Sequence, residues 1–146
     1  MKNISMPLEG WVSLSSLGLS IMYSLLMVSF YNVLIGPDGK GPDRFVEVGG
    51  VLIKNVSISG APSLILAGVV YGLTRAYGSK LSGIFLIISG IIMTLGSIIA
   101  NDMTSQIPED FYSNELVTVT YIFLAGGIGI LIIGIILLKK VQSVPR

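Results

Sequence analysis

The chain contains neither cysteine nor histidine. Without cysteine it can form no disulfide and carries no thiolate nucleophile. Without histidine it lacks the usual protein ligand of haem and copper and the commonest acid–base residue of enzymes, and with both missing the ordinary zinc sites are excluded. We therefore expect no catalytic residue, no cofactor and no metal in this chain, and we predict that it is not itself an enzyme.

Charged residues are also scarce. They make up 12% of the 146 residues, half of the ~25% that is usual in soluble domains. Apolar residues make up 52%, and the charges cluster between long apolar runs, which is typical of an integral membrane protein. The net charge of +1 gives no reason to expect nucleic acid, so the lipid bilayer is the expected surrounding. We expect one domain covering residues 1–146.

Four apolar segments are predicted to cross the bilayer, giving an all-α, multi-pass membrane protein: residues 11–35, 61–77, 81–101 and 116–138. No charge lies in the middle of any segment, whereas ion-coupled transporters and proton relays need an ionisable group there. The second segment is short, and the start of its helix stays open between Pro62 and residues 55–59. The tight turn Gly78-Ser79-Lys80 predicts that the second and third segments are antiparallel neighbours.

Residues 44–58, between the first and second spans, are predicted to form a β-hairpin outside the membrane. Two runs rich in β-branched residues flank Gly49-Gly50, and two glycines can both take the positive φ of a two-residue hairpin turn. Asn55-Val56-Ser57 fits a glycosylation sequon, a short signal that does not by itself establish modification. The strand alternation would place on one face, for docking on helix ends or on another subunit, Val46, Val48, Val51 and Ile53.

Small and hydroxyl residues recur on one face of each predicted helix. In the third span they come in pairs seven residues apart, and Gly127 and Gly134 of the fourth span also stand seven apart. The others stand four apart, and both spacings keep the residues on one side of a helix. Such a face lets another helix approach closely within a membrane. The predicted helix-packing residues are, in chain order, Ser16, Ser20, Ser24, Gly68, Gly72, Ala76, Gly83, Gly90, Ser97, Ala125 and Gly129.

The distribution of lysine and arginine predicts the orientation. With four spans, the head, the second turn and the tail share one side, and they carry six basic residues and one acid, Glu9. The other side carries three basic residues and seven acids. By the positive-inside rule both termini lie in the cytoplasm, and the hairpin and the acidic loop lie outside the cell membrane.

The four-span layout, the absent histidine and cysteine and the short lysine-bearing ends resemble the small accessory subunits of archaeal respiratory-type membrane complexes, such as those around the copper-dependent ammonia monooxygenase. The resemblance implies that the catalytic metals of such an oxidoreductase complex would belong to partner subunits. It implies no site residue in this chain.

Two hypotheses about function follow. The first is a non-catalytic structural subunit of a hetero-oligomeric membrane complex, which packs on other transmembrane subunits through its small-residue faces and its hairpin. A chain of this size cannot bury all those faces inside a four-helix bundle, so we infer lateral partners. The second is a small oligomeric channel or transporter in which Ser16, Ser20 and Ser24 line a polar pathway. Serine is routine at helix contacts, so the sequence favours the first.

Overall fold

The computed structural model describes residues 5–76 and 78–143. These residues form five α-helices, and they contain no strand. Four helical segments among them are long and apolar enough to cross a membrane, which confirms the predicted all-helical chain with four such segments. The helices are α1 (Leu8–Ile35), α2 (Val48–Asn55), α3 (Ala61–Thr74), α4 (Lys80–Thr104) and α5 (Asn114–Ser143).

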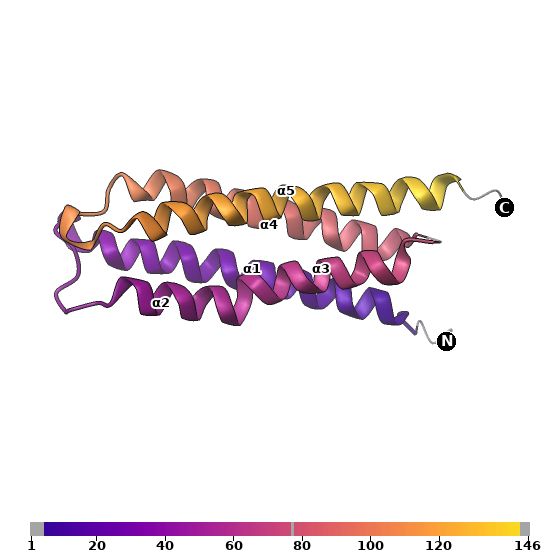
Figure 1. Cartoon of the computed structure of the whole chain (residues 1–146), viewed down its shortest axis with the longest axis horizontal. Coiled ribbons are helices and arrows are strands. Elements are labelled where there is room, and N and C mark those ends of the chain that lie inside the picture. Colours follow the sequence, from indigo (N-terminus) through magenta and orange to yellow (C-terminus); the bar gives the residue numbers. More distant parts are fainter. Residues whose placement is uncertain (1–4, 77, 144–146) are drawn as a thin grey trace.

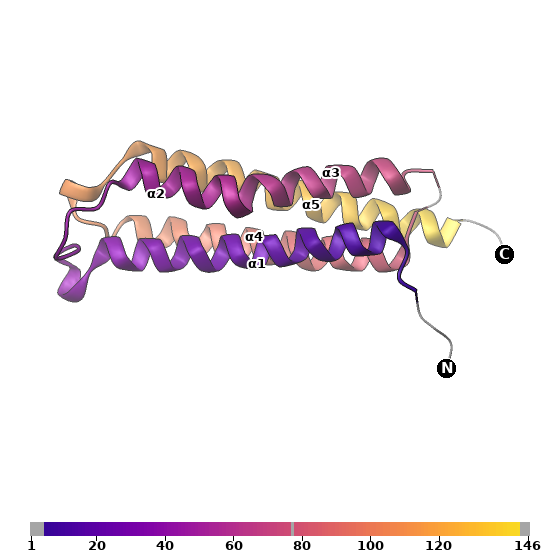
Figure 2. The ribbon, with the colours of Figure 1, turned by 90° about the horizontal axis from the view of Figure 1, so that it is seen from below.

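The helices form one elongated bundle of two layers (Figure 1). Figure 2 shows α1 and α4 in one layer and α2, α3 and α5 in the other. The most extensive packing joins α4 to α5 and α1 to α4, and α3 packs mainly on α1. The prediction that the second and third spans are neighbours is therefore wrong: the short turn at Gly78 connects helices that lie diagonally across the bundle.

The two ends of the bundle differ. One end carries the start of α1, the end of α5 and the turn at Gly78, and we call it the terminal end (Figure 1). The other carries the two longer connections, residues 36–47 and 105–113, and we call it the loop end. Residue 77, the predicted end of the second span, lies outside the described residues.

The predicted β-hairpin is wrong, because residues 48–55 form α2 and continue into α3. The whole helical segment Val48–Thr74 has 27 residues, about 40 Å at 1.5 Å per residue, which removes the difficulty of a second span too short for a bilayer. A helix satisfies its own backbone hydrogen bonds, whereas a lone hairpin leaves two open edges. Gly49 and Gly50 fall in the first turn of α2, where backbone N–H groups have no acceptor within the helix.

The four residues assigned to the hairpin docking face do not share a face in the helix. Val46, Val48 and Val51 are half-buried, whereas Ile53 is 65% exposed. The residue that turns fully inward is Leu52, 2% exposed, which the strand alternation placed on the opposite face. Side chains repeat every 3.6 residues along a helix and every 2 residues along a strand, so the helix turns Leu52 inward where the strand assignment placed Ile53.

A wide π turn, Val56–Gly60, joins α2 to α3. It comes just before Pro62, whose ring would crowd the carbonyl of residue 58 in a regular helix and which has no N–H to donate. The wide turn gives the ring room. Gly60 lets α5 approach here, since a Cβ on it would lie 2.6 Å from Phe123 Cε1 and 2.8 Å from Tyr23 Cδ2. Phe123 and Tyr23 stack with ring centroids 4.4 Å apart, so this turn is where α1, α3 and α5 meet.

Near the loop end, a tyrosine joins α1 to α5. The buried Tyr31 hydroxyl donates to the Leu116 carbonyl at 2.8 Å and lies 2.9 Å from Thr120 Oγ1. Tyr31→Phe removes both contacts without changing the ring, so we expect a loss of about 1 kcal/mol of unfolding free energy. Unfolding in detergent, followed by circular dichroism, measures it. Tyr121→Phe, at a position 56% exposed, is the control; equal midpoints for the two variants would contradict the prediction.

Candidate functional site

Four serines from three helices meet in the middle of the bundle: Ser16 and Ser20 of α1, Ser63 of α3 and Ser89 of α4. Ser20 Oγ lies 2.6 Å from both Ser63 Oγ and Ser89 Oγ. Ser16 Oγ donates to the Ser63 carbonyl at 2.9 Å, and Ser63 Oγ donates back to the Ser16 carbonyl at 2.9 Å. All four side chains are 0% exposed. We call these residues the serine network.

Every hydroxyl hydrogen of the serine network has an acceptor within the protein. Each hydroxyl has one hydrogen to donate. Since Ser63 donates to the Ser16 carbonyl, Ser20 must donate to Ser63, and Ser89 then donates to Ser20. Every hydroxyl of the network thus donates to a protein acceptor, which is the arrangement that stabilises polar groups inside a membrane bundle.

The third serine of the predicted α1 face continues this contact toward the loop end. Ser24 is 9% exposed and its hydroxyl donates to the Ile92 carbonyl of α4 at 3.1 Å. Ser16, Ser20 and Ser24 therefore lie between helices of one copy of the chain and bond to its atoms.

Backbone lies against backbone where α4 meets α5. A Cβ on Gly90 would lie 2.7 Å from the Gly127 carbonyl oxygen, and a Cβ on Gly83 would lie 3.1 Å from that of Gly134. The seven-residue spacing of Gly83 and Gly90 matches that of Gly127 and Gly134, so the two glycine pairs keep the helices close over two turns. Ser97, 1% exposed, extends the buried small residues of α4 toward the loop end.

The remaining predicted packing residues lie on the outside. A Cβ on Gly68, Gly72 or Gly129 would meet no atom within 4 Å. Gly129 is partly exposed, and the others are exposed. We call this set the outer small face, and it consists of Gly68 and Gly72 on α3, Ala76 just after α3, and Ala125 and Gly129 on α5. The predicted packing residues thus divide into an internal group and an external one.

Several internal partners were not predicted from the sequence. Neither Ser63 nor Ser89 was identified as a partner of the α1 serines. The seven-residue spacing of Gly127 and Gly134 was visible, but they were not included among the packing residues. A signal was present for Ser63, because Ser59, Ser63 and Ala67 stand four apart, as the α1 serines do. The spacing does not show that these residues pair with α1, because that pairing depends on how the helices dock.

The chemistry available inside the bundle is that of neutral hydroxyls. Among residues 5–76 and 78–143, no group of three or more acidic residues is placed to hold a metal ion. Comparison with known protein families, curated proteins and solved structures found no match. The geometry of the chain is therefore the basis for any proposal about its function.

Proposed function

We propose that the protein is a non-catalytic structural subunit of a multisubunit integral membrane complex, and that the outer small face contacts a neighbouring transmembrane helix. The observation that carries the proposal is the division of the small residues. The predicted packing residues of α1 and α4 are used inside one copy of the chain, whereas those of α3 and the outer glycine of α5 lie on the outside, and a Cβ on Gly68, Gly72 or Gly129 would meet no atom of it within 4 Å.

Glycine on a helix surface is unfavourable unless another helix packs against it. In a helix interior a glycine is less favourable than alanine by about 1 kcal/mol. Gly68 and Gly72 stand four apart on an exposed face, which is the small-xxx-small spacing of tight transmembrane helix pairs. Packing against a further helix would offset the cost of both glycines, since their absent side chains allow the two backbones to approach.

For orientation, we propose that the terminal end faces the cytoplasm and that the protein lies in a cell membrane. Arg75 and Lys80 flank the turn at this end, and Lys139 and Lys140 lie in the last turns of α5. Lys2 and Arg146, which the sequence argument also counted, lie outside the described residues. The positive-inside rule supports this placement.

For the complex itself, we propose an oxidoreductase assembly of the archaeal kind that the sequence resembles, in which partner subunits hold the metals. The support is the absence of cysteine and histidine from this chain together with its free helix face.

The double substitution Gly68→Leu, Gly72→Leu is expected to release the protein from its partners. Two leucine side chains would fill the space that an opposing helix needs, so we expect recovery of co-purifying subunits to fall about tenfold or more. Affinity purification from native membranes in mild detergent, with quantitative mass spectrometry, measures the recovery.

Gly18→Leu is the matched control, because a Cβ on Gly18 also meets no atom within 4 Å and Gly18 lies on α1, away from the outer small face. It should keep its partners. A wild-type protein that purifies as a lone monomer, or a double variant that retains every partner, would overturn the proposal.

The channel hypothesis has less support. Its pathway would be lined by Ser16, Ser20 and Ser24, yet these hydroxyls bond to protein atoms and are at most 9% exposed. Helices would have to separate before a solute could reach them. Solute flux or conductance through liposomes that contain this protein alone would favour the channel.

A further inference from the structure

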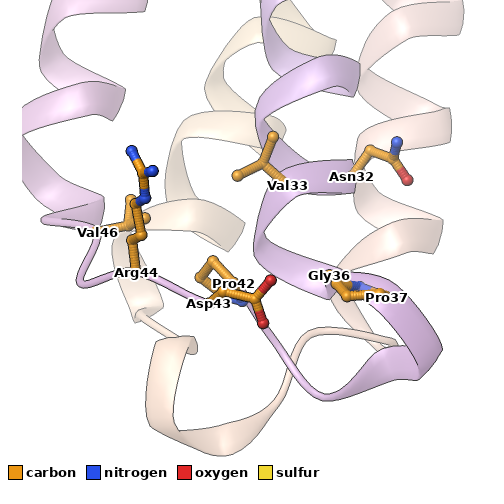
Figure 3. Close-up of a pocket in the computed structure, with 8 residues that line it drawn as sticks. All are labelled: Asn32, Val33, Gly36, Pro37, Pro42, Asp43, Arg44 and Val46. Atoms are coloured by element: carbon orange, nitrogen blue, oxygen red, sulfur yellow. The ribbon is translucent and has the colours of Figure 1, made fainter.

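A hollow of about 650 Å³ lies at the loop end, between the last turn of α1 and the chain that leads into α2 (Figure 3). Its apolar wall includes Val33 and Val46, and its polar groups are Asn32, Asp43 and Arg44. It is separate from the serine network and from the outer small face.

The hollow is built into the backbone. The N–H of Gly41 donates to the Ile35 carbonyl at 2.8 Å and folds the loop back on the end of α1. Gly36 and Gly41 take φ values of +68° and +89°, which other residues rarely adopt. Phe111 of the other loop packs against Gly41, since a Cβ on Gly41 would lie 2.7 Å from Phe111 Cε2. The loop that lines the hollow is thus held by the end of α1 and by the second loop of this end.

The length of α1 places the hollow at the depth of lipid headgroups. Its 28 residues span about 42 Å, against a hydrocarbon core of about 30 Å. A centred helix therefore projects by about four residues at each end. Asn32 is the fourth residue counted back from the end of α1, and the exposed Trp11 is the fourth from its start, where tryptophan favours the membrane interface.

The charges in the hollow are ordered by depth. Figure 3 shows the Arg44 guanidinium directed back along the helices, at the level of Val33, and the Asp43 carboxylate nearer to the loop. A positive group thus lies on the membrane side and a negative group farther out. Phe45, the next residue, is 93% exposed, which is unfavourable in water and favourable against lipid.

We propose that this hollow binds the headgroup of a phospholipid that carries both a phosphodiester and a primary amine, as phosphatidylethanolamine does. The guanidinium of Arg44 would take the phosphate, for which its paired N–H groups are suited. The carboxylate of Asp43 would take the ammonium, which lies farther from the bilayer than the phosphate. From the membrane outward, Arg44 and then Asp43 thus face the phosphate and then the ammonium of the headgroup. An anionic lipid without an amine would offer Asp43 no positive partner.

Native mass spectrometry of delipidated protein in detergent tests the site, with phosphatidylethanolamine, phosphatidylcholine and phosphatidylglycerol of identical acyl chains. We expect saturable binding, strongest for phosphatidylethanolamine. Arg44→Gln should weaken both zwitterionic lipids about tenfold. Asp43→Asn should weaken phosphatidylethanolamine about threefold and phosphatidylcholine little, since only the primary amine donates hydrogen bonds to the carboxylate.

Lys40→Gln is the matched control, because it removes a charge from an exposed residue of the same loop that does not line the hollow. It should bind as the wild type does. Circular dichroism of each variant tests whether the helices are intact. Wild-type binding by Arg44→Gln, stronger binding of phosphatidylglycerol than of phosphatidylethanolamine, or uptake that never saturates would each overturn the assignment.

Discussion

Replacing Gly90 of α4 with leucine is expected to break the packing of α4 on α5. Even the first carbon of a side chain there would lie 2.6 Å from the Leu131 amide nitrogen and 2.7 Å from the Gly127 carbonyl oxygen. Both atoms belong to the backbone, so they cannot move aside as a flexible side chain can, and the helices must separate. We expect the unfolding free energy to fall by about 3 kcal/mol or more. Thermal unfolding in detergent, followed by circular dichroism, measures the loss.

Gly18→Leu on α1 makes the same change where a Cβ meets no atom within 4 Å. Its unfolding free energy should be equal to that of the wild type or higher by up to about 1 kcal/mol, because leucine favours the helix over glycine. Gly90→Ala separates packing from helix propensity, because alanine favours the helix by about 1 kcal/mol and should nevertheless destabilise this protein. A Gly90→Leu variant that melts with the wild type would show that α4 and α5 do not approach as described.

The second large effect is expected from Ser20→Leu, at the centre of the serine network. The substitution removes the 2.6 Å contacts to Ser63 and Ser89 at a position that is 0% exposed. The lost hydrogen bonds cost about 1 kcal/mol each. Forcing a larger side chain between three helices costs a further ~1–3 kcal/mol. We expect a total of about 3–5 kcal/mol, measured by unfolding in detergent.

Ser29→Leu is the matched control, since it makes the same chemical change on an exposed face of the same helix. Leucine is favourable against lipid, so this variant should be as stable as the wild type or slightly more stable. Ser20→Ala removes the hydroxyl without adding volume and should cost about 1–2 kcal/mol. If Ser20→Leu and Ser29→Leu unfold alike, the α1 serines do not join the helices.

The membrane-spanning segments could be predicted from the sequence because their signal is the composition of long windows. The local conformation near Gly49-Gly50 could not be predicted in this way. The same residues satisfy a strand pattern and a helix pattern, and the two assignments differ in whether Leu52 or Ile53 turns inward. Leu52 is buried and Ile53 exposed, as the helix requires. The strand assignment treated the segment as a loop in water, whereas a chain entering lipid must satisfy its own backbone groups.

The candidate site could likewise be predicted only in part. A spacing of four identified the α1 face of Ser16, Ser20 and Ser24, because residues on one helix face are fixed by the helix itself. Its partners belong to other helices, and docking is decided by all contacts at once. For the same reason the sequence treats Gly90 and Gly68 alike, although one lies against the α5 backbone and the other meets no atom within 4 Å.

The diagonal connection at Gly78 has a consequence for biosynthesis. Each half of the chain folds back on itself as a helical hairpin, α1 with α3 and α4 with α5, and the two hairpins join chiefly through α1 and α4. During synthesis α1 and α3 leave the ribosome before α4, so until α4 follows them the hydroxyl of Ser20 has no Ser89 to meet. We expect the docking of the second half on the first to be the last folding event.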